Sequence, residues 1–190
     1  MSPGLPYGHM GATLTDAVLQ SGISYETVVL PRVERILRDY PDAVTTSAFA
    51  EVLEREGAPA VLQWNGSKKI ATLSALVSLL VSEHIETEAQ FRTWLESDSN
   101  LSRLHEIKGI KDKTAHYLQI LVGGQGIAID RHLVRFLAEA GVRTASYDEA
   151  RQVLRETAAL VGKNESLLDY SIWLYMSKRE PVAERMCAST

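Results

Sequence analysis

The chain has 190 residues, 45% of them hydrophobic, and a formal net charge of −4 from 20 basic and 24 acidic residues. This is enough for a core in one domain or two small lobes, without metals or disulfides. The single cysteine, Cys187, excludes an intramolecular disulfide and a four-cysteine iron–sulfur cluster. No apolar run reaches membrane-spanning length and no secretory signal is present, so we expect a soluble intracellular protein.

The first ten residues, MSPGLPYGHM, show no helical periodicity. They are rich in Pro and Gly, and they end in a His-Met pair that is typical of a cloning remnant. We therefore predict that residues 1–11 are a disordered leader or such a remnant. Residues 12–190 are expected to form a single unit.

Helical spacing of apolar residues dominates the rest of the chain. Capping signals support it: Thr87 begins a capping box, Asn100 is the expected cap of the next helix, and Ser146 begins a second box. Strand signals are limited to residues 127–129, so the expected fold is all-α. In chain order, the predicted helices cover residues 12–20, 24–39, 48–56, 59–63, 68–83, 88–96, two within about 101–122, 131–140, 147–161 and 167–178.

The window from Leu104 to Arg135, LHEIKGIKDKTAHYLQILVGGQGIAIDRHLVR, contains the most informative pattern. Apolar residues at helical spacing on both sides of residues 108–111 predict two helices packed across a tight turn. Such a turn leaves backbone N–H groups exposed at a helix N-terminus, which favours phosphate binding. Lys113 then begins one helix, and Asp130 begins the following one.

Lys113 and Asp130 are the candidate catalytic residues. The positive end of the helix dipole and partial burial both favour the neutral, nucleophilic form of a lysine amine. An aspartate that caps its own helix is instead held as a carboxylate. Taken in isolation, a lysine near a helix start is usually a solvated surface group, and an N-cap aspartate usually only caps its helix.

The runs IKGIKDKTA and IDRH in this window resemble the helix-hairpin-helix signature of the base-excision DNA glycosylases (HhH-GPD superfamily). The resemblance implies two helical lobes with the hairpin, about residues 101–122, between them. It also implies a glycosylase with AP-lyase activity, in which Lys113 attacks C1′ of a flipped nucleotide and forms a Schiff base. Asp130 would stabilise the positive charge that develops on the sugar.

The resemblance further implies that damaged double-stranded DNA is the partner, bound by a monomer in the cytoplasm or nucleoid. Gly109, Ile110 and Lys111 would contact phosphate through N–H groups, and His132 would contact another phosphate. No iron–sulfur cluster or metal is expected, although the hairpin of the family often binds a monovalent cation. Lys111 replaces the second hairpin glycine of the family, and a left-handed backbone there would cost about 1 kcal/mol.

The segment LLDYSIWLYMSKR resembles the final helix of archaeal-type 8-oxoguanine glycosylases, which also lack the cluster. Asp169 and Trp173 lie four residues apart on one helix face and would meet the base together. Gln20 is a candidate for this pocket, or for the wedge that fills the space left by the flipped base. These residues favour 8-oxoguanine as substrate. Oxidised pyrimidines, the substrates of endonuclease III-like relatives, are the alternative.

A noncatalytic module that binds the DNA backbone through its hairpin is a competing hypothesis, and the acidic net charge favours it. The basic residues nevertheless cluster around the signature, at Lys108, Lys111, Lys113, Arg131, His132 and Arg135. A helical protein–protein scaffold is a third hypothesis, but it explains neither the lysine nor the aspartate.

Overall fold

The computed structural model describes residues 6–179, and within this range the chain is all-helical, with eleven α-helices, one π-helix and no strand. The all-α prediction is therefore confirmed. In chain order the elements are α1 (Met10–Leu19), the π-helix η1 (Tyr25–Val29), α2 (Leu30–Asp39), α3 (Thr46–Glu56), α4 (Ala58–Leu62), α5 (Ser67–Ser82), α6 (Glu88–Trp94), α7 (Asp98–Glu106), α8 (Asp112–Leu121), α9 (Arg131–Glu139), α10 (Tyr147–Leu160) and α11 (Glu165–Ser177).

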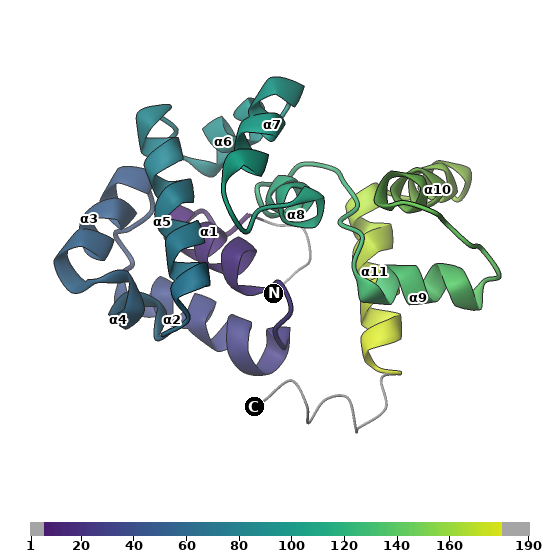
Figure 1. Ribbon diagram of the computed structural model, residues 1–190, viewed down its shortest axis with the longest axis horizontal. Helices are drawn as coiled ribbons and strands as arrows, with labels where there is room; N and C mark the ends of the chain where they lie inside the picture. Colours follow the sequence, from purple (N-terminus) through teal and green to yellow (C-terminus); the bar gives the residue numbers. More distant parts are fainter. Residues whose placement is uncertain (1–5, 180–190) are drawn as a thin grey trace.

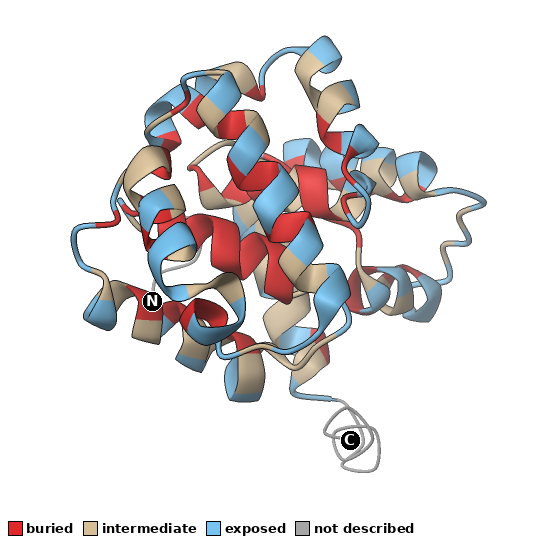
Figure 2. Cartoon of the chain, turned by 60° about the vertical axis from the view of Figure 1, so that its left-hand side comes forward, coloured by how far each residue is buried: buried red, intermediate tan, exposed pale blue. Residues whose placement is uncertain are grey.

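Buried apolar side chains form two separate clusters, which define two lobes. The first lobe, from α1 to α8, is built around α1, all ten residues of which are buried. The second lobe contains α9, α10 and α11, with α9 and α10 both packed against α11. Figure 1 shows the two groups of helices, joined by the segment that leaves α8, and Figure 2 shows buried residues on the inward sides of the helices.

The segment before α1 is anchored to the first lobe by Glu88. This carboxylate accepts hydrogen bonds from the backbone N–H groups of Tyr7 (3.2 Å) and Gly8 (2.8 Å) and from the hydroxyl of Thr13. Met10 is fully buried in the core. The prediction that residues 1–11 lie outside the fold is therefore wrong for residues 7–11, whereas residues 1–5 lie outside the described range.

The structure differs from the predicted helices at two places, residues 24–39 and the start of α7. The predicted helix 24–39 is divided into a π-helix and α2, with Pro31 in the first turn of α2. Asn100 is not a cap, because α7 begins two residues earlier, at Asp98, and the Asn100 side-chain amide donates to the Trp94 carbonyl (2.8 Å). The capping box at Thr87 and the cap at Ser146 are confirmed.

Helices α7 and α8 are joined by the tight turn predicted at this point in the chain. The Ile110 N–H donates to the Ile107 carbonyl (3.0 Å), and Gly109 adopts a φ of 105°. Thr72, on α5, donates to the Lys108 carbonyl (2.7 Å). Lys111 has an extended backbone (φ −128°) as the N-cap of α8, so the strain predicted for a side chain at this position does not arise.

Gly109→Ala should destabilise the protein by about 2 kcal/mol, because the left-handed φ and a collision with Thr72 act together. An added Cβ would lie 2.3 Å from Thr72 Oγ1, which must then leave the Lys108 carbonyl. Urea unfolding measures this loss. Lys111→Gly is the matched control, and we expect it to lower stability by only about 0.5 kcal/mol, through the entropy of the unfolded chain. Equal losses in the two variants would contradict this description of the turn.

Candidate active site

Lys113 lies in the first turn of α8 and is half-buried where the two lobes meet. Its Nζ donates to Oε1 of Gln20, the C-cap residue of α1, over 3.1 Å. Burial lowers the pKa of the amine, as expected, and the positive charge of Arg131 acts in the same direction. The carboxylates of Asp130 and Asp169 oppose this change. The amine is thus electrostatically coupled to both carboxylates.

Asp130 is the N-cap of α9, as predicted. Its Oδ1 accepts from the backbone N–H groups of His132 (2.8 Å) and Leu133 (3.0 Å). Oδ2 accepts no hydrogen bond from any residue within 6–179. One oxygen of the carboxylate is therefore fixed by the start of α9.

Asp169 is a second carboxyl group near the amine, on α11. Its Oδ2 accepts from the Ala128 N–H (2.7 Å), in the segment that leads to Asp130. Burial raises its pKa to about 7, with the charge of Asp130 adding to the effect, while the Ala128 hydrogen bond and Lys113 oppose it. At neutral pH the Asp169 carboxyl group can therefore be partly protonated.

Asp169→Asn should change the pH dependence of stability. Because the folded chain binds the Asp169 proton more tightly than the unfolded chain, this group makes the native state more stable as pH falls from about 7 toward 4. The variant lacks this effect, so it should be more stable than the wild type by about 3 kcal/mol at pH 7.5 and nearly equal to it at pH 4. Urea unfolding across this pH range tests the difference, and a constant difference would contradict it.

Trp173, one turn after Asp169 on α11, is surrounded by aromatic rings from both lobes. The Tyr25 ring, in the π-helix, lies edge-on to it at 6.2 Å, and the His132 ring lies edge-on at 6.3 Å. Tyr170 is stacked at 6.0 Å. Trp173 therefore connects the π-helix of the first lobe to the start of α9.

Tyr25 is held in turn by a buried polar cluster around Asp16. This fully buried carboxyl group accepts from the hydroxyls of Tyr7 (2.7 Å), Tyr117 (3.2 Å) and Tyr25 (3.4 Å). Burial raises its pKa to about 6, while the three hydroxyl groups oppose the change. Tyr117 lies one turn after Lys113 on α8, so the cluster also fixes that helix against α1.

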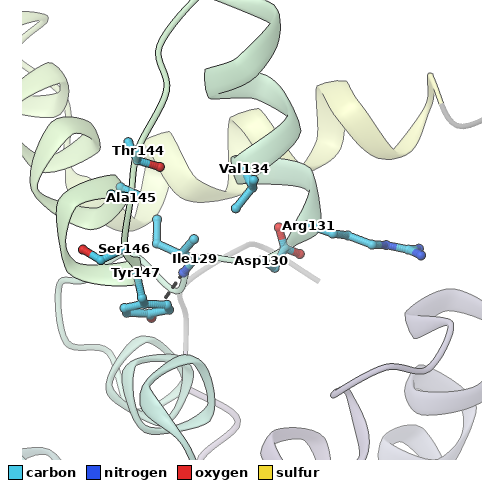
Figure 3. A pocket seen from close by; sticks show the side chains of 9 residues that line it. Ile129, Asp130, Arg131, Val134, Thr144, Ala145, Ser146 and Tyr147 are labelled. Atoms are coloured by element: carbon cyan, nitrogen blue, oxygen red, sulfur yellow. Dashed lines mark hydrogen bonds between the residues drawn. The ribbon is translucent and has the colours of Figure 1, made fainter.

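A cavity of about 410 Å³ lies beside Asp130, on the side of α9 and α10. Figure 3 shows Thr144, Ala145 and Ser146 on its α10 side, with the Arg131 side chain extending away from them. Tyr147 also lines it, and its hydroxyl accepts from the Ile129 N–H (3.3 Å). The cavity reaches Asp130 but not Lys113, so it adjoins the candidate site without containing the amine.

The structure brings six of the predicted site residues into one region between the lobes, which we call the interlobe site: Gln20, Lys113, Asp130, His132, Asp169 and Trp173. The three hairpin residues lie in the turn before α8. Gly109 and Lys111 are exposed there, whereas Ile110 is buried. His132 is only 7% exposed.

Sequence reasoning missed Tyr25, Lys69 and Tyr147. Lys69, on α5, approaches the same end of α1 as Lys113. Tyr147 accepts or donates a hydrogen bond with His116 (2.8 Å), and the two rings are stacked, so it links α10 to α8. Only Tyr147 had a sequence signal, because it follows the Ser146 cap. The other two depend on contacts between segments distant in the chain.

Within residues 6–179, no group of three or more His, Cys, Asp or Glu side chains is placed to hold a metal ion. In the same range, no helix is long and apolar enough to cross a membrane.

Comparison with known proteins gives one result at the level of families. A family model described as "Domain of unknown function (DUF8548)" matches residues 7–177. Searches of curated proteins and of solved structures found no match. The match begins at Tyr7, whose N–H donates to Glu88, and ends at Ser177, the last residue of α11. It therefore covers both lobes. The chain therefore belongs to the DUF8548 family.

Proposed function

We propose that this protein is a bifunctional DNA glycosylase and AP lyase of base excision repair, with Lys113 as the nucleophile. The observation that carries the proposal is the half-buried Lys113 amine, whose pKa burial lowers, coupled to the carboxyl groups of Asp130 and Asp169. A lysine that forms a Schiff base must be neutral when it attacks, and burial is a general means of achieving this.

The arrangement of elements also supports the proposal. Helices α7 and α8 are joined by a tight turn, and Lys113 lies in the first turn of α8. Asp130 is the N-cap of the next helix, α9. This is the order that the helix-hairpin-helix resemblance implies. The interlobe site has polar groups from α1, α8, α9 and α11 on several sides, as recognition of a flipped nucleotide requires.

In the proposed reaction, the lone pair of Lys113 Nζ attacks C1′ of the flipped nucleotide, and the bond from C1′ to the damaged base breaks. The base leaves with the bonding electrons and is then protonated. The Asp130 carboxylate stabilises the positive charge that develops on the sugar. The nitrogen then loses a proton, and the C1′–O4′ bond breaks as O4′ takes up a proton, which gives the protonated Schiff base. Loss of a proton from C2′ then allows the C3′–O bond to break, and the 3′ phosphate leaves with the bonding electrons. Water finally releases the amine.

For the DNA backbone, we propose contacts at the hairpin. Gly109 and Lys111 are exposed at the N-terminus of α8, where unpaired N–H groups and the helix dipole favour an anion. Burial beside Trp173 leaves little of the His132 ring for the phosphate contact that the resemblance implies. We expect a monomer acting on double-stranded DNA.

For the base, we propose 8-oxoguanine, with Asp169, Trp173 and Gln20 around it. A carboxyl group that titrates near pH 7 can accept or donate a hydrogen bond to a purine edge, and Trp173 offers an aromatic surface. Gln20 contributes a buried Nε2 donor that has no partner among the described residues. Oxidised pyrimidines are the alternative substrate class.

The proposal is tested by incubating the purified protein with duplexes that contain 8-oxoguanine, an oxidised pyrimidine or an abasic site, and by measuring base release and strand cleavage. Release of 8-oxoguanine with cleavage is the expected result. Release of only the pyrimidine would transfer the proposal to that substrate. DNA binding without base release or cleavage on any duplex would contradict an enzyme and favour the noncatalytic hairpin module.

A further inference from the structure

Lys69 is a half-buried lysine of α5 with no part in the reaction described above. Its Nζ donates to the backbone carbonyls of Val18 (2.6 Å) and Ser21 (3.0 Å). Both carbonyls belong to the C-terminal end of α1, where helix carbonyls lack intrahelical partners and carry partial negative charge. The amine therefore holds this end of α1 against the start of α5.

Gln20 lies between these two carbonyls in the chain, and its side chain turns to the other lysine. Its Oε1 accepts from Lys113 Nζ at 3.1 Å, and its Nε2 is buried without a partner among the described residues. The last turn of α1 is thus bonded to two amines, one through its backbone and one through a side chain. Any shift of this turn would move the acceptor of Lys113.

We propose that Lys69 positions and tunes the amine of Lys113, by holding the end of α1 that carries Gln20 and by placing a second positive charge beside that amine. The catalytic use of the Lys113 amine rests on the proposed function. The coupling between the two lysines is a property of the folded chain alone.

The electrostatics of the pair support this role. Burial lowers the pKa of Lys69 to about 8, and the charge of Lys113 adds to the effect. The interaction energy between two charges is mutual, so a charged Lys69 also disfavours the protonated form of Lys113. A neighbouring cation is a recognised way to produce a nucleophilic lysine at neutral pH. The other charged groups that act on Lys113 come from two elements: Asp130 and Arg131 at the start of α9, and Asp169 on α11.

A purely structural role for Lys69 makes a different prediction. If the amine only caps α1, its replacement should lower stability and leave the titration of Lys113 unchanged. Lys69→Gln separates the two roles, because its amide can still donate to a carbonyl while the charge is lost. Lys69→Arg keeps both the charge and the donors. Lys68→Gln removes a charge from the exposed neighbouring position, and it is the matched control.

The test is competitive labelling of the full chain with acetic anhydride over a range of pH, with peptide mass spectrometry to follow each lysine. In Lys69→Gln, we expect the labelling of Lys113 at pH 7 to fall by about threefold or more, because Lys69 carries its charge at this pH in the wild type. Lys69→Arg and Lys68→Gln should keep the wild-type labelling. The reciprocal measurement uses Lys113→Gln, in which the pKa of Lys69 should rise by about 0.5 unit, because the charge of Lys113 now lowers it. It decides the question even if Lys69→Gln fails to fold.

Unchanged labelling of Lys113 at pH 7 in Lys69→Gln, or an unchanged Lys69 titration in Lys113→Gln, would overturn the proposal. Neither measurement needs DNA, so an absence of glycosylase activity in the wild type would refute the proposed function and leave this coupling to be judged separately. Where the wild type does form an adduct with an abasic-site duplex, Lys69→Gln should form it about threefold more slowly or worse at pH 7. The two rates should converge well above pH 8, where Lys69 has lost its charge in the wild type as well.

Discussion

Lys113→Gln should reduce the borohydride-trapped adduct with an abasic-site duplex by at least about a thousandfold, because glutamine has no nucleophilic amine. The Gln20 side chain can still bond to an amide at this position, so we expect the α8 N-terminus to keep its structure. Trapping followed by denaturing gel electrophoresis measures the covalent product. Binding of the duplex should change by less than about threefold, since the loss is chemical.

The control for this experiment is Lys163→Gln, at an exposed position between α10 and α11. This variant removes the same charge from the second lobe at a residue with no role in the site, and it should form the wild-type amount of adduct. Adduct formation by Lys113→Gln at the wild-type rate would mean that another amine is the nucleophile. The noncatalytic module instead predicts no adduct in any of the three proteins.

Asp130→Asn should slow base excision by about a hundredfold or more, because it removes the negative charge that stabilises the developing sugar cation. Asparagine is as good an N-cap as aspartate, so its side-chain oxygen can keep the bonds that Oδ1 now accepts from His132 and Leu133. Single-turnover release of the damaged base measures this step. Adduct formation at a preformed abasic site should be much less affected, because the base has already left.

Thermal unfolding is the control for Asp130→Asn, and the stability should change by less than about 0.5 kcal/mol. If Asp130 acts only as a helix cap, neither the stability nor the excision rate of the folded protein should change, because asparagine caps a helix as well as aspartate does. That pattern would reduce Asp130 to a helix cap. If Asp130→Asn slowed base excision and adduct formation at an abasic site to the same extent, the carboxylate would instead act through the Lys113 amine.

The local parts of the fold could be predicted from the sequence. The turn between α7 and α8, the position of Lys113 in the first turn of a helix, and the cap at Asp130 depend on residues within a few positions of each other. Gly109 was expected in the turn, and the structure adds the reason, which is the approach of Thr72. The strain expected at Lys111 was wrong because the left-handed residue is two positions earlier.

Parts of the fold that depend on distant residues could not be predicted. Residues 7–11 looked like a leader, because the carboxylate that binds them, Glu88, follows about eighty positions later. The division of the helix at 24–39 into a π-helix and α2 had no pattern of its own, although it brings Tyr25 to Trp173. Lys69 is an ordinary surface lysine by sequence, and only the approach of α5 to α1 gives it a buried environment.

The most direct test of the central claim is to identify the residue that is bonded to DNA. The wild-type protein is trapped with borohydride on an abasic-site duplex, digested with protease and nuclease, and the modified peptide is sequenced by mass spectrometry. We predict that the sugar remnant is attached to Nζ of Lys113, in the peptide that begins α8. A remnant on Lys69 or on the N-terminal amine would contradict Lys113 as the nucleophile, and a protein that binds the duplex without forming any adduct would contradict lyase activity.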